Sequence, residues 1–214
     1  MKVHAEPYIN QIGEVLSRKS VLEIGCGNGL RSARLGEFCS SLRAIDPDED
    51  FINQARLDNN LPNIQYQVGS AQSLEFPDST FDSSIFTLSL HHVPRGEMPN
   101  AITEARRVTR QAGHLIFIEP TFDGSLFEAE LHFNACDGDE RAAKALAYHS
   151  ILTASGLEEV NEFSGETIFE FSSLDDFKES MKPQERLDEL EHFLEKHKYR
   201  LRAQRRINIF KIVP

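Results

Sequence analysis

The stretch that decides the fold runs from residue 21 to residue 29 and reads Val21-Leu22-Glu23-Ile24-Gly25-Cys26-Gly27-Asn28-Gly29. Its first half is a short apolar run that ends at three glycines on alternate positions, and helical spacing of apolar residues resumes at Leu30. This pattern predicts a strand, a tight turn and a helix. Because glycine has no Cβ and tolerates positive φ, the turn either lets a ligand approach the backbone or is simply tight.

The same alternation continues along the chain. After the strand at 21–24, strands are predicted at 42–45, 64–68, 81–88 and 114–118, with helices at 48–57 and 97–109, and an amphipathic helix precedes them all from Tyr8. Parallel strands need long right-handed crossovers, so this rhythm predicts a mainly parallel α/β sheet with helices on both faces.

The last third is less regular. Residues 126–155 are expected to be helical with a break near 137–139, and residues 167–171 and 207–214 alternate like two further strands. Between these strands, residues 174–206 predict a charged helical insertion that Pro183 divides, and its basic end suits either a solvated helix terminus or an anion-binding patch. One domain is expected: an N-terminal helix in 1–19, a cofactor-binding core in 20–120, acceptor-side helices and a sixth strand in 121–206, and the last strand in 207–214.

Composition restricts the class of protein. The chain has 214 residues, 34 acidic and 23 basic side chains and a formal net charge of -11, which disfavours nucleic acid and anionic membranes as partners. The chain has three cysteines, Cys26, Cys39 and Cys136. Their spacing matches no metal or redox motif, and an odd number cannot all pair in disulfides, which fits a reducing compartment. No secretory signal or membrane span is recognised, so a cytoplasmic location is expected.

An acidic residue marks the end of the second predicted strand. A carboxylate there, Asp46, can accept both hydroxyls of a ribose, although Asp46 could instead cap the helix that follows. Dinucleotide sites use G-x-G-x-x-G, whereas this chain has G-x-G-x-G with Leu30 at the next position. The glycine spacing therefore argues against a nicotinamide-dependent oxidoreductase, which stays open as a weaker alternative.

Residues 21–29 closely resemble motif I of class I S-adenosylmethionine-dependent methyltransferases, particularly the group that includes ubiquinone and menaquinone methyltransferases. The resemblance continues in order through the segments at residues 44–47, 68–74, 81–82 and 113–120. It implies a doubly wound, mainly parallel seven-stranded sheet with a Rossmann-like fold and a helical insertion before the last strand. It also implies S-adenosylmethionine as the cofactor and a methyl acceptor of unknown identity.

The resemblance assigns cofactor contacts to particular residues. Glu23 and the backbone of Gly25, Cys26 and Gly27 would hold the methionine part, and Asp46 would bind the ribose. The adenine and sulfonium contacts would come from Pro47, Ser70, Ala71, Gln72 and Leu88. Many relatives carry aspartate where this chain has Ser70, and a hydroxyl is a weaker acceptor, so cofactor binding is expected to be weaker unless Gln72 compensates.

Two histidines follow the fourth strand, where the family reaches its acceptor. His91 and His92 titrate near neutrality, so either could remove a proton from the acceptor, or they could serve in packing and capping. No metal is expected, because Glu128 and His132, four residues apart on a helix, lack a third ligand of obvious spacing. The aromatic segment around Phe122 and Phe127 is expected to cover the acceptor pocket.

Residues 89–92, which follow the fourth predicted strand, also restrict the class of substrate. They lack the Asp or Asn followed by Pro-Pro and an aromatic residue with which amino-methylating nucleic-acid enzymes grip a base, so a small organic acceptor is expected. The sequence favours a methyltransferase acting by direct displacement, and a cofactor-binding partner or sensor without transfer is the alternative. Oligomeric state is left open.

Overall fold

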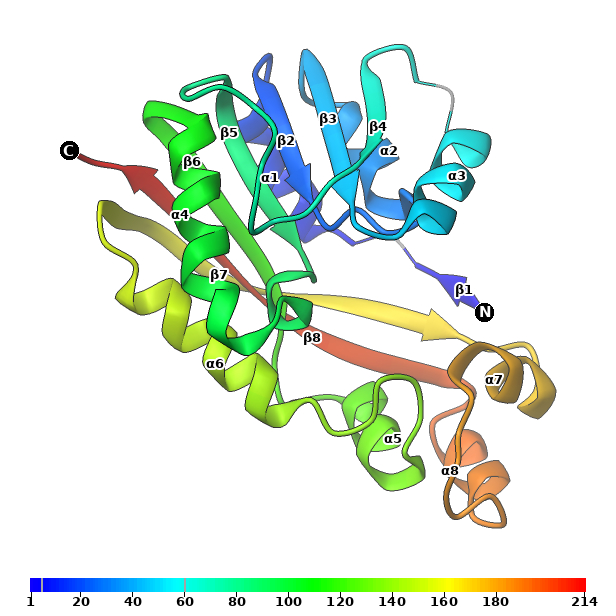
Figure 1. The fold of residues 1–214 in the computed structure, drawn as a ribbon. Helices are drawn as coiled ribbons and strands as arrows, with labels where there is room; N and C mark the ends of the chain where they lie inside the picture. Colours follow the sequence, from blue (N-terminus) through cyan, green and yellow to red (C-terminus); the bar gives the residue numbers. More distant parts are fainter. Residues whose placement is uncertain (5, 60) are drawn as a thin grey trace.

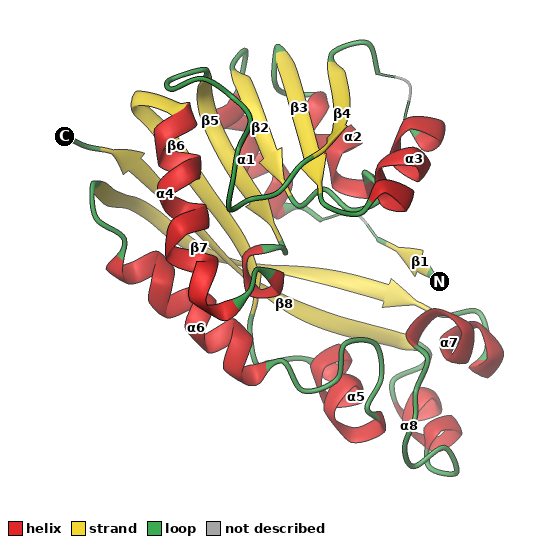
Figure 2. Cartoon of the chain, viewed as in Figure 1, coloured by secondary structure: helices red, strands yellow, loops and turns green. Residues whose placement is uncertain are grey.

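The computed structural model describes residues 1–4, 6–59 and 61–214 and is built on one eight-stranded sheet (Figures 1 and 2). The order across the sheet is β1-β7-β8-β6-β5-β2-β3-β4. Five strands, from β4 to β6, pair in parallel, whereas β8, β7 and β1 pair antiparallel. The strands are β1 (Lys2–Val3), β2 (Ser20–Ile24), β3 (Ser41–Asp46), β4 (Ile64–Val68), β5 (Phe81–Thr87), β6 (Thr109–Pro120), β7 (Leu157–Glu170) and β8 (Arg200–Ile212).

Helices cover both faces of the sheet, which confirms the doubly wound α/β arrangement. One face packs against α1, α2 and α3, and the other against α4 and α6. The helices are α1 (Tyr8–Leu16), α2 (Leu30–Gly36), α3 (Glu49–Asp58), α4 (Met98–Val108), α5 (Ser125–Phe133), α6 (Arg141–Thr153), α7 (Leu174–Met181) and α8 (Leu190–Lys196), with short 3₁₀ turns η1 (Leu90–His92) and η2 (Arg95–Glu97).

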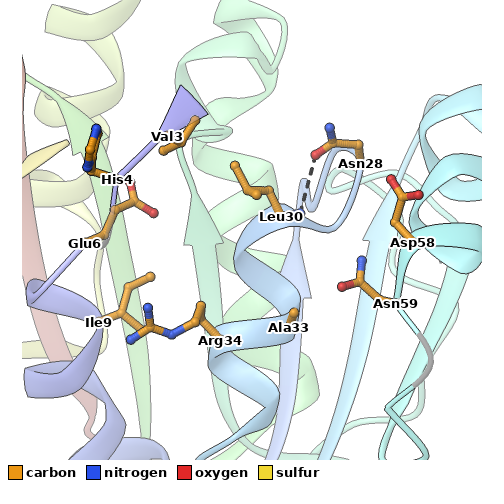
Figure 3. Close-up of a pocket in the computed structure, with 10 residues that line it drawn as sticks. All are labelled: Val3, His4, Glu6, Ile9, Asn28, Leu30, Ala33, Arg34, Asp58 and Asn59. Carbon is orange, nitrogen blue, oxygen red and sulfur yellow. Dashed lines mark hydrogen bonds between the residues drawn. The ribbon is translucent and has the colours of Figure 1, made fainter. Parts of the chain in front are cut away.

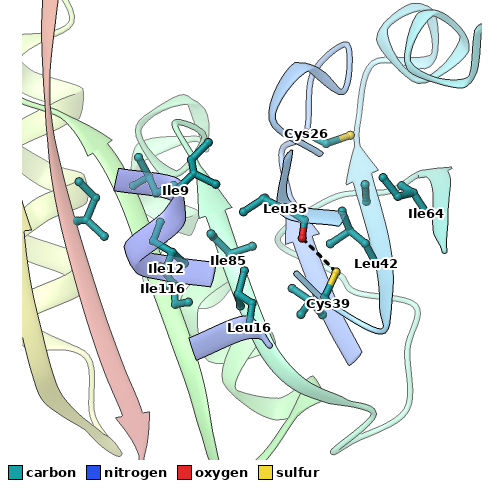
Figure 4. Packing of buried hydrophobic residues seen from close by; sticks show 14 of the residues in the cluster. Ile9, Ile12, Leu16, Cys26, Leu35, Cys39, Leu42, Ile64, Ile85 and Ile116 are labelled. Atoms are coloured by element: carbon teal, nitrogen blue, oxygen red, sulfur yellow. Dashed lines mark hydrogen bonds between the residues drawn. The ribbon is translucent and has the colours of Figure 1, made fainter. Parts of the chain in front are cut away.

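Apolar periodicity explains how these layers join. On α1, Ile9, Ile12 and Leu16 recur at helical spacing and are buried against strand residues such as Ile85 and Ile116 (Figure 4). On the opposite face of the sheet, apolar residues of α4 and α6 pack in a second cluster. This cluster includes Phe86 of β5 and Phe117 of β6, whose rings stack. None of the helices among residues 1–4, 6–59 and 61–214 is long and apolar enough to cross a membrane.

The prediction of a seven-stranded, mainly parallel sheet is wrong in two respects. The sheet has eight strands, and three of them, β8, β7 and β1, pair antiparallel. The additional strand, β1, has two residues and pairs with the end of β7, so no local periodicity could reveal it. Strands β7 and β8 are also much longer than predicted and extend past the other strands toward α5, α7 and α8 (Figure 1). Residues 200–206, expected to be a basic helix end, belong to β8.

Alternation accounts for that last difference. In β8, Leu201, Ala203 and Arg205 are buried while their neighbours face outward or lie partly covered, which is the period of a strand. The predicted division of the helical insertion is confirmed, because α7 ends at Met181 and α8 begins at Leu190 on the other side of Pro183. A third cluster, formed by α5, α7, α8 and the ends of β7 and β8, covers this extension.

A buried polar group joins the two halves of the sheet. Glu6, just before α1, accepts hydrogen bonds from Arg31 Nη2 at 2.9 Å, Tyr8 Oη at 2.5 Å and Thr167 Oγ1 at 2.6 Å. Burial alone would raise the pKa of Glu6, but the Arg31 charge and these hydrogen bonds lower it overall. We call Glu6, Tyr8, Arg31 and Thr167 the Glu6 cluster; it links α2 of the parallel half to β7 of the antiparallel half.

Candidate active site

The parallel strands reverse their order between β2 and β5, and ligands of open α/β sheets bind at the carboxyl edge beside such a reversal. The turn after β2 is held there by Gly25 N and Cys26 N, which donate to Ile45 O at 2.8 and 3.0 Å. A Cβ on Gly25, whose φ is +76°, would lie 2.1 Å from Ser89 Cβ. Position 25 therefore requires glycine, because Ser89, which follows β5, approaches the turn so closely.

Gly27 has a different reason to be glycine. Its φ is +52°, and a Cβ built there would meet nothing within 4 Å. The backbone at Gly27 consequently borders open space, as expected of a turn that a ligand can approach.

Asp46 ties the end of β3 to this glycine turn. The Asp46 side chain is 8% exposed; Oδ2 accepts from Gly27 N at 2.8 Å and Oδ1 from Asp48 N at 3.0 Å. The alternative that Asp46 caps α3 is wrong, because Asp48 is the N-cap and accepts from Asp50 N and Phe51 N. Pro47, between them, leads into the helix. Each Asp46 oxygen keeps a second lone pair for a ligand, and ribose binding there remains a prediction.

Glu23 lies beneath the turn rather than on its surface. It is fully buried, with Oε2 accepting from Ser32 Oγ at 2.6 Å and Oε1 from Thr87 Oγ1 at 2.9 Å. Burial raises the pKa of Glu23. These contacts join β2 to α2 and β5 and support the glycine turn from below, while the predicted contact with a methionine group stays a prediction. Burial likewise raises the pKa of the Cys26 thiol, which suits an unreactive residue.

The predicted adenine side follows β4. Ser70 and Gln72 are brought together, because the Ser70 hydroxyl donates to Gln72 Oε1, and Ala71 is buried beside them. Asn100 of α4 also holds this turn through a 3.0 Å hydrogen bond to Gln72 O. The structure thus gives Ser70 and Gln72 a mutual contact, and their interaction with adenine stays a prediction.

The residues that follow β5 include a strained backbone conformation and are held in place by hydrogen bonds. Leu88 has φ of +58°, a region that residues other than glycine rarely adopt, and its N–H donates to Ile118 O at 2.8 Å. Ser89 Oγ donates to Ile24 O at 2.6 Å, which joins this exit to the glycine turn. Backbone strain of this kind is often found at ligand sites.

His91 and His92 come next, on η1, and have different surroundings. His91 is 6% exposed, and its Nδ1 lies 2.5 Å from Glu119 Oε2 at the end of β6; Glu119 Oε1 accepts from Leu90 N. Burial would lower the pKa of His91, but Glu119 raises it overall. His92 is half exposed, and burial and the neighbouring His91 lower its pKa.

Two residues that the sequence did not single out complete this group. Glu140, the N-cap residue of α6, lies 3.8 Å from His91 Nε2 and 3.5 Å from His92 Nδ1. Lys144, one turn further and 6% exposed, places Nζ 3.4 Å from both Glu140 Oε2 and Glu130 Oε2. A charged pair four residues apart at a predicted helix start was the available signal, but only the tertiary fold brings it to the histidines.

Glu128 and His132, which the sequence places four residues apart, have separate partners in the structure. His132 Nε2 pairs with Glu189 at 2.8 Å, and Glu128 approaches His197 Nε2 at 3.9 Å. Of the aromatic segment, Phe122 is 48% exposed and Phe127 lies beneath the Lys144 ammonium, 5.0 Å from ring centroid to nitrogen. The covering of an acceptor pocket by this segment stays a prediction.

Two cavities of about 500 and 550 Å³ are lined by residues other than the predicted cofactor contacts. One, of about 500 Å³, lies between the N-terminal segment and the outer side of the glycine turn, and Figure 3 shows His4, Glu6, Asn28 and Leu30 around it. The other, of about 550 Å³, is lined by Ser20 and Ser41 at the amino edge of the sheet, away from the strand ends where ligands of this fold bind.

Fold and site together define an α/β protein with the glycine turn, the β3 carboxylate and the strand order of a class I S-adenosylmethionine-dependent methyltransferase. Residues 22–117, slightly under half of the chain, match the family model described as a methyltransferase domain.

Relatives with related sequences carry methyltransferase names. A fatty-acid O-methyltransferase from Mycolicibacterium smegmatis is 33% identical over 103 residues, which cover 47% of this chain and 37% of that protein. A ubiquinone/menaquinone biosynthesis C-methyltransferase from Rickettsia bellii is 30% identical over 124 residues, 53% of this chain and 48% of that protein. The chain thus spans less than half the length of these curated relatives.

Solved structures reproduce the fold over nearly the whole chain. A candidate methyltransferase from Bacillus halodurans superposes with a TM-score of 0.72 at 20% identity, covering 97% of this chain and 98% of that one. The cyclase SpnF superposes with a TM-score of 0.63 at 19% identity, covering 97% and 81%. At such identities the likeness shows the fold alone.

Proposed function

We propose that this protein binds S-adenosylmethionine at the carboxyl edge of β2, β3 and β4 and transfers its methyl group to a small organic acceptor beside η1. The observation that carries the proposal is the 2.8 Å bond between Asp46 Oδ2 and Gly27 N, next to the open space over Gly27. This contact holds a carboxylate and a glycine turn side by side, as a nucleoside ligand with a second polar end requires.

The transfer itself needs little chemistry from the protein. An acceptor lone pair forms a bond to the methyl carbon while the carbon–sulfur bond breaks, and its electrons stay on sulfur, which leaves as a neutral thioether. Holding acceptor, methyl and sulfur in line supplies most of the rate enhancement for such a step. The His91–His92 side of the site, next to the strained exit at Leu88, is the place proposed for the acceptor.

The acceptor class is proposed from charge and from relatives. The net charge of -11 disfavours polyanionic acceptors, and the two relatives above act, by name, on fatty acids and in ubiquinone or menaquinone biosynthesis. SpnF, by name a cyclase, shares the fold, so the fold by itself does not require methyl transfer, and cofactor binding without transfer is the rival proposal.

Calorimetric titration with S-adenosylhomocysteine tests the cofactor site. We expect Asp46→Ala to raise the Kd by about 5- to 150-fold, equivalent to about 1 to 3 kcal/mol for lost charge-assisted hydrogen bonds. Asp48→Ala is the matched control: it removes a carboxylate two residues away whose hydrogen bonds, among the described residues, go to Asp50 N and Phe51 N of α3, so the Kd should stay within about twofold. Equal affinity in the two variants would remove Asp46 from the site.

Two further measurements separate the rivals. Titration with NAD should give no binding, because the third glycine of the dinucleotide pattern is absent. Radiolabelled methyl transfer into carboxylic acids, phenols and amines should label at least one class. Cofactor binding without labelling of any acceptor class or of an extract would favour the non-transferring alternative.

A further inference from the structure

Three possible metal-ligating groups converge beside the proposed acceptor site. One ring nitrogen of His91, one of His92 and a Glu140 carboxylate oxygen lie within 4.8 Å of one another. The two imidazole–carboxylate separations are 3.8 and 3.5 Å. Ligand atoms around a tetrahedral ion with bonds of about 2.0 to 2.2 Å lie about 3.3 to 3.6 Å apart, so a small inward movement would complete one face of such a site.

These three groups keep lone pairs free although two of them have other contacts: Glu140 Oε2 lies 3.4 Å from Lys144 Nζ, and His91 bonds to Glu119 through Nδ1. Within the part of the chain that the structure describes, His91 Nε2, His92 Nδ1 and the Glu140 carboxylate make no hydrogen bond of normal geometry. Lys144 supplies one positive charge to Glu140, and one imidazole nitrogen of each histidine faces the same carboxylate. Two imidazoles and a carboxylate that converge in this way point to a metal cation as their ligand.

Glu119 adds the outer contact that metal-binding histidines commonly have. Its Oε2 lies 2.5 Å from His91 Nδ1, and its Oε1 is fixed by Leu90 N at 3.0 Å. A carboxylate bonded to one imidazole nitrogen sets the tautomer and orients the other nitrogen toward a metal ion. The ring of His91 is thereby held with Nε2 directed at Glu140.

The charges around the cluster favour a cation. Carboxylates reach it from every neighbouring element: Glu119 from β6, Glu130 from α5, Glu140 at the start of α6 and Asp137 from the preceding loop. The buried cations that face these carboxylates are Lys144, through Glu130 and Glu140, and Arg205, which acts on Glu130. Four carboxylates against these two cations leave room for a divalent ion even with both in place.

We propose that His91, His92 and Glu140 bind one divalent transition-metal ion, with Zn²⁺ the best match to two imidazoles and a carboxylate, and with a coordination position open to the acceptor. This inference rests on the proposed function for the identity of that acceptor, a hydroxyl, thiol or carboxyl compound. The bound ion lowers the pKa of the acceptor group; its proton leaves to water before the acceptor attacks the methyl carbon and the sulfonium departs as a thioether. The histidines then serve as ligands, where the sequence predicted a base and no metal.

Metal titration of the full chain after chelator treatment tests the site. We expect one Zn²⁺ per chain, with the affinity lowered at least 100-fold in Glu140→Gln and in His92→Ala, and about 10- to 100-fold in Glu119→Gln, which removes only the outer carboxylate charge. His132→Ala is the control, because His132 pairs with Glu189 and has no further ligand; its affinity should match that of the unsubstituted chain. Circular dichroism of each variant checks that the fold is kept.

Co²⁺ loading of the unsubstituted chain gives a second readout that does not depend on variants. Visible absorption without strong near-ultraviolet thiolate bands is expected, whereas thiolate bands would assign the metal to the exposed Cys136. Zn²⁺ affinity equal in all four variants, or no bound ion, would overturn the metal site. S-adenosylhomocysteine titration of the metal-free chain separates the two failures: binding there with no Zn²⁺ site defeats this inference alone, and a Zn²⁺ site without cofactor binding defeats the proposed function.

Discussion

The parallel and antiparallel halves of the sheet are built differently. Strands β2 and β3, of five and six residues, are mostly buried and end at turns that carry predicted cofactor residues, whereas β7 and β8, of 14 and 13 residues, are half polar and have the small helices α5, α7 and α8 at one end. The parallel half repeats a strand–turn–helix unit, and the turns that carry the predicted site residues lie at one edge of the sheet. The second half has no such repeat, and the proposed acceptor site lies where α6 and β6 meet it. The difference suggests that cofactor binding depends on a regular pattern and acceptor choice on irregular additions.

The largest expected effect comes from separating the halves at the Glu6 cluster. Arg31→Met leaves the Glu6 carboxylate buried without its cation, and breaking a buried ion pair in this way costs about 3 to 5 kcal/mol of unfolding free energy. Urea unfolding measures the loss. Arg34→Met, which removes the next arginine on α2 from a partly exposed position, should change stability by no more than about 0.5 kcal/mol. Similar losses in both variants would show that the cluster does not hold the halves together.

The same cluster should also govern stability in acid. The pKa of Glu6 is lowered in the folded chain, so its contribution is present above the ordinary value of 4.5 and is lost as pH falls through the folded pKa. Arg31→Met should therefore flatten the acid limb of a plot of melting temperature against pH. An unchanged acid limb would count against a charge-stabilised Glu6.

Glu23, inside the parallel half, should have the opposite pH dependence and a smaller effect. Burial raises its folded pKa above 4.5, so stability is greatest below that value and falls as pH rises through the folded pKa. Glu23→Gln removes this titration, and its melting temperature should gain on that of the unsubstituted chain as pH increases. Glu14→Gln, at an exposed position on α1, should follow the unsubstituted curve; parallel curves for Glu23→Gln would contradict the raised pKa.

The smallest expected effect compares backbone strain in the two halves. Ser79, before β5, and Lys182, after α7, have φ of +54° and +49°. Glycine at either position relieves the left-handed conformation but gains freedom in the unfolded chain, so each substitution should stabilise by less than about 1 kcal/mol. Thermal melting of Ser79→Gly and Lys182→Gly measures both, and destabilisation in either would show that its side chain makes a needed contact.

The sequence predicted the parallel half well because its information is local. The apolar run at 21–24, the glycines that follow it and Asp46 at the end of β3 are each recognisable within a few residues. In the antiparallel half, charged residues at alternate positions of β8 read equally well as a solvated helix, and only pairing with β6 and β7 decides between the two.

The candidate site divides in the same way. Asp46 contacts Gly27, and Ser70 contacts Gln72, because these residues follow neighbouring parallel strands; their role in cofactor binding stays a prediction. Glu119, Glu140 and Lys144 were missed as partners of the histidines, since they come from β6 and α6 and no spacing in the sequence relates them to η1.

The contact between Gly25 and Ser89 has a consequence for redesign of the site. Because a methyl group at position 25 would overlap the Ser89 side chain and the φ of +76° also favours glycine, position 25 has to stay glycine while serine occupies position 89. Libraries that randomise the residues after β5 to change acceptor preference would therefore also act on the glycine turn through position 89. Keeping Ser89 and Gly25 fixed while the neighbouring positions vary would leave the turn intact.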